Sequence, residues 1–103
     1  IEAGKVDSPE IEELLRQILK DYIGKLDALV LGCTHYPFMK KAMAKVLGGG
    51  VELLDGGAGT ARETRRRLLE AGLLNDGQGE LVVENSSGDP EKIRLTHRLL
   101  EAD

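Results

Sequence analysis

The feature that most constrains the fold is an alternation between helical patterns and short runs rich in Leu and Val. The runs comprise residues 28–32, 51–54 and 81–84. The first run, Ala-Leu-Val-Leu-Gly, is apolar throughout, which is typical of a strand buried on both faces of a parallel sheet. Because helical patterns flank every run, the sequence predicts parallel strands that are covered by helices.

Four segments carry helical spacing or helix-end signals. The first is expected to begin at Ser8-Pro9, because Ser caps free amides and Pro suits the first turn, and to end near Gly24. Its apolar residues form one stripe: Ile11, Leu14, Leu15, Ile18, Leu19 and Tyr22. The others are expected from Pro37 to about Leu47, from about 58 to 70, and from Asp89-Pro90 onward. Their expected inward residues are Phe38, Ala42, Met43, Val46 and Leu47 in the second helix and Ile93, Leu99 and Leu100 in the last.

The length and composition suit one globular domain. The chain has 103 residues, of which 41% are hydrophobic and 31% are charged, and only 3% are aromatic, so the core must be largely aliphatic. We therefore predict a single α/β domain over residues 1–103, with three α-β-α layers and a short, mostly parallel sheet. The element order is α-β-α-β-α-β-α.

The charge and the single cysteine exclude several classes of protein. A net charge of −4 disfavours a nucleic acid partner, and the basic run Arg65–Arg67 lies beside Glu63 and Glu70, as on a solvated helix face. One cysteine permits no internal disulfide. No apolar run has the length of a membrane helix, and a signal peptide is absent, so we expect a cytoplasmic protein with a reduced thiol.

Groups capable of chemistry follow each expected strand. They are Cys33, Asp55 and residues 86–89, and the carboxyl ends of parallel strands share one rim, where open α/β sheets bind ligands. Cys33 is the sharpest candidate, because a thiol near a helix N-terminus favours the thiolate and His35 is close in sequence. A buried packing role is the alternative for a free cysteine. No metal site is predicted, since Cys33 and His35 supply only two ligands and His97 lies in another helix.

Residues 32–37 read Gly-Cys-Thr-His-Tyr-Pro, preceded by Leu29-Val30-Leu31, and this string resembles the signature of glutamate racemases. Aspartate racemases have a similar Gly-Cys-Thr but usually lack the His-Tyr-Pro that follows. Other blocks resemble the same family in the same order: Ile1-Glu2-Ala3-Gly4, Asp7-Ser8-Pro9-Glu10, Leu53-Leu54-Asp55-Gly56-Gly57-Ala58 and Ser87-Gly88-Asp89-Pro90. The resemblance covers nearly all of this chain but less than half of a typical member, in its C-terminal part.

The resemblance implies part of the racemase fold and an isomerase activity without a cofactor. Glutamate racemases interconvert L- and D-glutamate by two-base proton transfer and supply D-glutamate for peptidoglycan. By match, Cys33 is one of the two catalytic bases and His35 assists it or orients the substrate. Thr34 is expected to bind the substrate carboxylate, and Glu2 matches an acidic residue near the site.

Some residues depart from the family pattern, and others are expected to have structural rather than catalytic roles. Gly56 stands where the family usually has Ser, and Thr96-His97 replaces small or apolar residues. Asp55 is expected to cap a turn, Asp89 to cap a helix and His97 to lie on the surface. The glycines of residues 56–59 fit a turn better than a phosphate cradle. Two alternatives to the site roles remain. His35 packs as a loop residue on the rim of the sheet, and Glu2, which lies near the start of the sequence, is unstructured.

The N-terminal half of the family's proteins, which carries the first catalytic cysteine, has no counterpart in this sequence. We therefore expect the isolated chain to be inactive or weakly active, and Ile1 in place of an initiator Met is consistent with trimming. The expected partner is the missing N-terminal half or, alternatively, a second copy whose Cys33 faces the first. A non-catalytic α/β module that binds a small amino acid or the missing half, and an aspartate racemase-like enzyme, are further alternatives.

Overall fold

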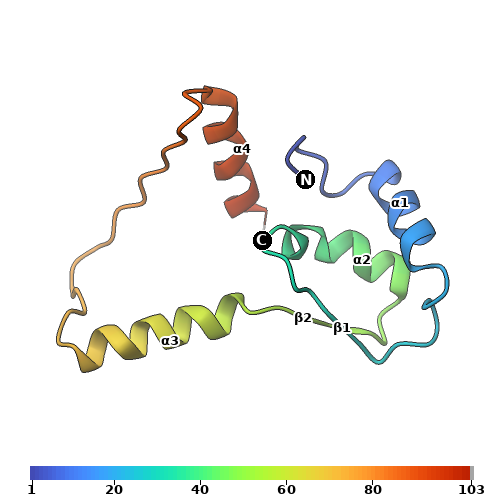
Figure 1. Cartoon of the computed structure of the whole chain (residues 1–103), viewed down its shortest axis with the longest axis horizontal. Helices are drawn as coiled ribbons and strands as arrows, with labels where there is room; N and C mark the ends of the chain where they lie inside the picture. Colours follow the sequence, from blue (N-terminus) through green and yellow to red (C-terminus); the bar gives the residue numbers. More distant parts are fainter. Residues whose placement is uncertain (103) are drawn as a thin grey trace.

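A computed structural model of the chain describes residues 1–102. Helices and strands alternate along the chain in much of the predicted order (Figure 1). The elements are α1 (Pro9–Leu19), β1 (Ala28–Val30), the 3-10 helix η1 (Tyr36–Met39), α2 (Lys40–Leu47), β2 (Glu52–Leu54), α3 (Gly57–Glu70) and α4 (Pro90–Glu101).

The two strands pair in parallel and confirm the predicted class, α/β with a short parallel sheet. Leu29 lies opposite Leu53 in the register. The ladder is extended by the amide of Leu31, which donates to the carbonyl of Leu54 at 2.7 Å. The connection between the strands contains η1 and α2, as a parallel pair requires a crossover. Both Leu29 and Leu53 pack toward the helices.

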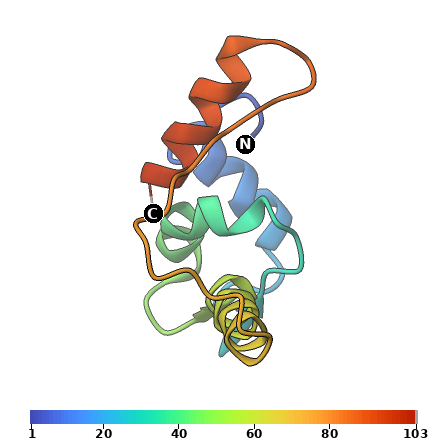
Figure 2. The same cartoon turned by 90° about the vertical axis from the view of Figure 1, so that its left-hand side faces the viewer.

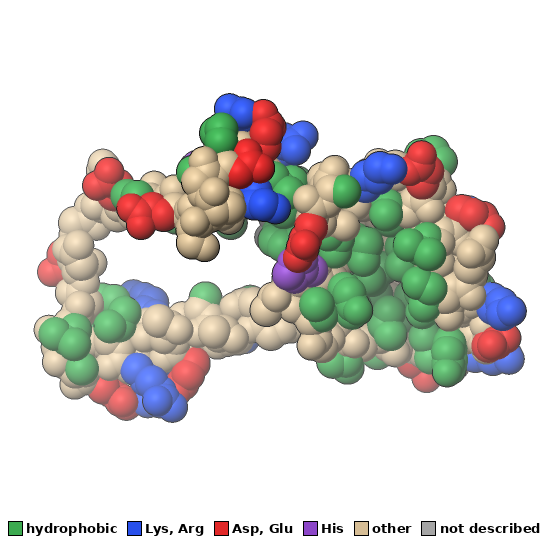
Figure 3. Space-filling model, turned by 45° about the horizontal axis from the view of Figure 1, so that its top comes forward, with side chains coloured by type: hydrophobic (Ala, Val, Ile, Leu, Met, Phe, Trp, Pro, Cys, Tyr) green, Lys and Arg blue, Asp and Glu red, His purple; other side chains and the backbone are tan. Residues whose placement is uncertain are grey.

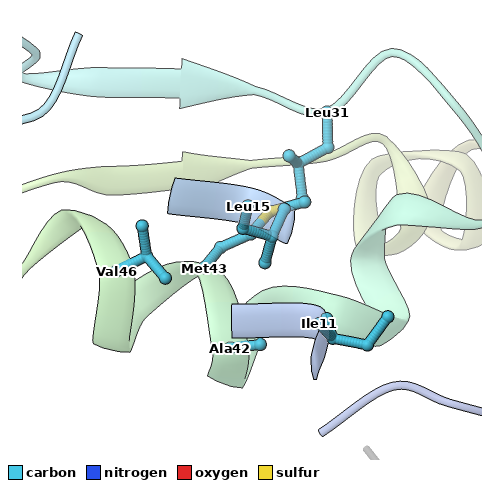
Figure 4. Packing of buried hydrophobic residues seen from close by; sticks show 6 residues of the cluster. All are labelled: Ile11, Leu15, Leu31, Ala42, Met43 and Val46. Carbon is cyan, nitrogen blue, oxygen red and sulfur yellow. The ribbon is translucent and has the colours of Figure 1, made fainter. Parts of the chain in front are cut away.

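The core lies between one face of this sheet and the helices α1 and α2. Figure 4 shows its side chains converging from the two helices and from the segment after β1. The cluster comprises Ile11, Leu15, Leu31, Ala42, Met43 and Val46. Each large member stabilises the fold by about 1.5–3 kcal/mol through removal of apolar surface from water. The prediction of an aliphatic core is confirmed, as is the inward face of α2.

Helix α1 begins where the sequence predicts and ends earlier. The Ser8 hydroxyl accepts a hydrogen bond from the Ile11 amide at 3.4 Å, and Pro9 occupies the first turn. The helix ends at Leu19, and Gly24, with a φ of 79°, belongs to the following turn and does not end the helix as expected. Only part of the apolar stripe is buried, because Leu14, Ile18 and Tyr22 are exposed.

The second helix begins in a different form from the one predicted. Residues 36–39 form the 3-10 helix η1, and the α-helix starts only at Lys40. The amide of Phe38 donates to the carbonyl of His35 at 3.2 Å, which is the tighter hydrogen-bond spacing common at helix starts. The α-helix therefore starts farther along the chain from Cys33 than expected, with the 3-10 helix between them.

Two strand predictions are wrong. Strand β1 is not buried on both faces, since Val30 is 72% exposed and neighbours the exposed Leu54. Residues 81–84 do not form a strand: they are extended but pair with no other segment of residues 1–102. The physical reason is the same in both cases, because no part of residues 1–102 covers these surfaces. Of the three expected layers, these residues form the sheet and one helical layer.

The molecule is open at the side of α3 and α4. Figures 1 and 2 agree that these helices lie apart and are joined by a long extended segment. Neither helix contains a buried residue, so in α4 the expected inward Leu100 is exposed, whereas Ile93 and Leu99 are half-buried. The radius of gyration is 17.0 Å, compared with about 13 Å for a compact chain of this length.

Within residues 1–102, no helix has the length and apolar character needed to cross a membrane.

Candidate active site

Cys33 lies in the loop that leaves the sheet after β1. Leu31 is buried in the core and anchors the start of this loop, and η1 follows it. Between these fixed points, Cys33 is a free, half-buried thiol, and Thr34 and His35 are exposed. The thiol is therefore neither sealed in the core nor fully solvated, and it lies just past the end of β1.

Glu2 reaches the same loop from the beginning of the chain. A turn closed by the Gly4 amide, which donates to the Ile1 carbonyl at 2.8 Å, places it there. Its Oε1 is 3.1 Å from Nε2 of His35. Glu2 is therefore not unstructured, which was the alternative expectation, because its side chain pairs with His35, 33 positions away.

Both ring nitrogens of His35 have polar neighbours. Its Nδ1 is 3.3 Å from the hydroxyl of Thr34, and its Nε2 faces Glu2. A carboxylate only accepts hydrogen bonds, so Nε2 carries the proton in the neutral ring and Nδ1 then accepts from Thr34. The imidazole is held between these two side chains and remains 47% exposed.

Two adjoining cavities border these residues. One of about 530 Å³ is lined by Cys33, His35 and Glu2 together with apolar residues of α1. The other, of about 630 Å³, is lined by Thr34, His35 and Glu2 together with residues of α4. The Glu2–His35 pair is common to both cavities. The four residues predicted to form the site are thus neighbours, but Cys33 and Thr34 line different cavities.

Helix α4 adds residues that the sequence analysis did not select. Lys92, Leu95 and Thr96 line the cavity that Thr34 borders, and Asn85 joins them from the loop before the helix. The sequence could have indicated the position of Lys92, because this residue lies in the first turn of the helix that the Asp89-Pro90 signal predicts. It brings a positive charge next to a cavity that also contains the Glu2 carboxylate.

Asp55 lies outside both cavities and has a structural role. Its Oδ1 accepts a hydrogen bond from the Gly57 amide at 2.7 Å, which confirms the predicted turn, and its carboxylate pairs with Lys40. The Lys40 ammonium and then the Gly57 amide lower the pKa of Asp55 below its usual value. The pair ties the segment after β2 to the first residue of α2.

The remaining predicted roles are also structural. Asp89 caps α4 through the Glu91 amide at 2.9 Å, His97 is exposed, and Arg66 and Arg67 pair with Glu63 on the solvated face of α3. Within residues 1–102, no three His, Cys, Asp or Glu side chains are placed to hold a metal ion. The candidate site brings one thiol together with an imidazole–carboxylate pair.

Such an arrangement suits proton transfer. A thiol, an imidazole and a carboxylate all act as general acids and bases near neutral pH when they are positioned next to a substrate. The cavity beside Cys33 is lined mainly by apolar side chains, including Ile11, Leu14 and Ile18. Figure 3 shows this broad apolar surface (green) next to a histidine (purple) and an acidic side chain (red).

No protein-family model matches the sequence. Among curated proteins, the glutamate racemase of Clostridium botulinum is 42% identical over 105 residues, covering 99% of this chain and 41% of that protein. The glutamate racemase of Thermus thermophilus is 47% identical over 103 residues, covering 98% of this chain and 39% of that protein. The chain thus spans about two-fifths of the length of these relatives.

Solved structures agree with the sequence similarity. Glutamate racemase from Thermus thermophilus in complex with beta-chloro-D-alanine superimposes with a TM-score of 0.73 at 42% identity, covering 96% of this chain and 39% of that one. The enzyme from Francisella tularensis in complex with D-glutamate gives a TM-score of 0.71 at 25% identity, covering 97% of this chain and 38% of that one. The resemblance to glutamate racemases is confirmed over nearly the whole chain.

Proposed function

We propose that this chain is the part of a glutamate racemase that carries one of the two catalytic bases, Cys33. The observation that carries the proposal is the half-buried thiol at the edge of a cavity that also contains the Glu2–His35 pair. The similarity to glutamate racemases supports the substrate assignment, because one of the similar structures contains D-glutamate.

The reaction requires two bases on opposite faces of the substrate α-carbon. The Cys33 thiolate removes the α-proton from one face, which breaks the C–H bond and leaves the electron pair on the α-carbon. An acid on the opposite face then delivers a proton and forms the new C–H bond with inverted configuration. The reverse reaction exchanges these roles, so no cofactor or redox step is involved.

The neighbouring residues have distinct roles in this proposal. Thr34 binds the substrate α-carboxylate through its hydroxyl and amide, on the far side of the imidazole from Glu2. His35 assists proton transfer at Cys33 or orients the ammonium group of the substrate, and the Glu2 carboxylate holds the imidazole through Nε2. The D-glutamate produced would serve peptidoglycan synthesis.

The second base has to come from a different polypeptide segment. Cys33 is the only cysteine in the sequence. The relatives are about two and a half times as long as this chain, as the 39–41% coverage requires. We assign the second base to the part of the racemase that this chain does not match, and a second copy of this chain is the alternative that the test below distinguishes.

The test is a chimera in which this chain replaces the matching two-fifths of the Thermus thermophilus glutamate racemase. We expect the chimera to convert L- to D-glutamate, measured by a D-glutamate-specific assay, and we expect Cys33→Ser to lower kcat by roughly 10²–10⁴-fold through loss of a general base. Thr64→Ala, on the exposed face of α3, is the matched control and should leave kcat unchanged.

The isolated chain provides the second arm of the test. It should show no racemisation, because one thiol cannot act on both faces of the α-carbon. Activity of the isolated chain that rises with the square of its concentration would transfer the second base to another copy. A folded chimera whose Cys33→Ser variant keeps full activity would refute the catalytic role of Cys33.

A further inference from the structure

The chain contains two Asp-Gly steps, Asp55-Gly56 and Asp76-Gly77. At such a step the amide nitrogen of the glycine can attack the γ-carbon of the aspartate, because glycine has no side chain that obstructs a close approach. The reaction requires an aspartate side chain that is free to rotate toward the next amide. Since the two steps consist of the same residues, their surroundings in the fold decide which one reacts.

The fold holds Asp55 away from this reaction. Its side chain is 16% exposed, its carboxylate pairs with Lys40, and its Oδ1 accepts a hydrogen bond from the Gly57 amide at 2.7 Å. The carbonyl of Gly56 accepts from the Thr60 amide at 2.8 Å, which fixes the backbone at the start of α3. Rotation of the carboxyl group onto the Gly56 nitrogen would break both interactions of the charged carboxylate, which are stronger than those between neutral groups.

Asp76 lies in the loop after α3 and lacks such restraints. Among residues 1–102, no hydrogen bond or ion pair reaches its carboxylate, and both Asp76 and Gly77 are exposed. The Gly77 amide donates to Oδ1 of Asn75 at 2.9 Å. A hydrogen bond at the surface contributes little net stability, because water replaces it when it opens. The Gly77 nitrogen is therefore accessible to the neighbouring carboxyl group.

We propose that Asp76 is a site of spontaneous isomerisation to isoaspartate, whereas Asp55 is protected by the fold. The Gly77 nitrogen forms a bond to the Asp76 γ-carbon, and the carboxyl hydroxyl leaves with the amide proton as water, which closes a succinimide ring. Water then opens the ring. Attack at the α-carbonyl directs the main chain through the β-carbon, and attack at the γ-carbonyl restores aspartate. The water released in the first step is consumed in the second, so no co-reactant is required.

The two asparagines of the chain are poorer candidates for the related loss of their amide group. Asn75 is followed by Asp76, whose side chain crowds the attacking nitrogen. The Oδ1 of Asn85 accepts hydrogen bonds from the amide and the hydroxyl of Ser87 at 3.0 and 2.6 Å, which restrain its rotation. The structure therefore singles out Asp76 among the acidic and amide side chains that precede a small residue.

The modification would change the connection between α3 and the long extended segment that follows it (Figure 1). It inserts one methylene into the main chain and keeps the negative charge. Asp76 lies outside the hydrophobic core and lines neither cavity at the Cys33 loop. The modified chain should therefore keep the core and the loop, and the inference does not depend on the racemase assignment.

Storage of the purified chain at neutral pH and body temperature tests the proposal. Isoaspartate is detected by an isoaspartyl-specific carboxyl methyltransferase and is located by separating the peptides after proteolysis. We expect a peptide that contains Asp76 to acquire a second form of unchanged mass, several-fold faster than a peptide that contains Asp55. Equal rates at the two positions, or no isoaspartate at Asp76, would overturn the proposal. Loss of the Asn75 amide group would instead raise the mass.

Two synthetic peptides provide the matched control, one covering residues 51–58 and the other residues 73–80. Neither peptide has the ion pair with Lys40, so both should form isoaspartate at similar rates. The protein should then reproduce the rate of the second peptide and fall well below that of the first. A first peptide that is as slow as the folded protein would show that local sequence protects Asp55, and would refute the protective role of the fold.

Three variants complete the experiment. Asp76→Glu should abolish the modification, because closure of the larger ring is much slower. Gly77→Ala should slow it, since a Cβ there hinders the attack and lies 3.2 Å from Oδ1 of Asn75, whereas Gly79→Ala, with nothing within 4 Å of its Cβ, should leave the rate unchanged. Isoaspartate that still accumulates at the same rate in Gly77→Ala would contradict attack by the Gly77 nitrogen.

Discussion

Gly4 shows how one residue places a side chain beside the candidate site. Its φ is 82°, and a Cβ at this position would lie 3.2 Å from a guanidinium nitrogen of Arg98 and 3.6 Å from Leu95. The turn that it forms holds Glu2 beside His35. Both the backbone conformation and the approach of α4 therefore favour glycine.

We predict that Gly4→Ala displaces Glu2 from His35. An L-residue in the left-handed region costs roughly 1–2 kcal/mol, and a short turn near the chain end relieves this strain by moving. The imidazole resonances of His35 in NMR spectra should then shift toward those of the Glu2→Gln variant. Gly49→Ala is the control, because nothing lies within 4 Å of its Cβ and its φ is not positive.

The prediction fails if the His35 ring resonances of Gly4→Ala coincide with those of the unchanged protein. That result would mean that the pairing of Glu2 with His35 does not depend on the turn.

Among the elements, α3 depends on interactions within the helix. It has no buried residue, so tertiary packing contributes little to its stability. Glu63 pairs with Arg66 and Arg67 at 2.8 Å, one turn along the helix, and Arg66 also pairs with Glu70. Pairs at this spacing stabilise an isolated helix modestly and are screened by salt.

The pH dependence of α3 follows from Glu63. Hydrogen bonds from Arg66 and then Arg67 lower the pKa of its carboxyl from 4.5 to about 2. Because the folded pKa lies below the unfolded value, the stabilisation is complete above pH 4.5 and is lost as the pH falls toward about 2. We expect NMR Cα shifts of α3 to lose helical character over this range.

Glu63→Gln is the matched variant for this measurement. It removes the titrating group. The Cα shifts near residues 63–67 should therefore be less helical already at neutral pH, and they should change less on acidification than those of the unmodified chain. Helical shifts that persist unchanged to pH 2 in the unmodified chain would contradict the assigned role of these ion pairs.

For the whole molecule, the open shape leads to a prediction for solution scattering. Helix α3 and the extended segment after it make few contacts with the core, and the radius of gyration of 17.0 Å reflects this. Small-angle X-ray scattering of the isolated chain at low concentration should therefore give a value near 17 Å. A compact chain of this length would give about 13 Å.

A measured radius of gyration near the compact value would mean that α3 and the extended segment after it fold back over the exposed face of β1 and β2. Such a result would leave the Cys33 loop unaffected, because that loop is anchored by the core on the opposite face of the sheet. A radius of gyration that falls with increasing salt would instead assign the extended shape to repulsion between like charges, which salt screens.

Local patterns in the sequence determined most elements and the loop that carries the candidate site. Ser8-Pro9 and Asp89-Pro90 predicted two helix starts because capping and proline geometry act within one turn. The apolar run before Cys33 predicted β1, and the string around Cys33 led to the racemase resemblance that the comparisons confirm. All of these signals depend on neighbours that are close along the chain.

Only the tertiary structure decided what depends on distant partners. It brought Glu2 to His35 across 33 positions, and it separated Cys33 from Thr34 into different cavities. It also left residues 81–84 unpaired and Val30 exposed, although their sequences favour buried strands. A strand needs a partner for its backbone and a layer for its side chains, and both come from contacts that a local pattern does not contain.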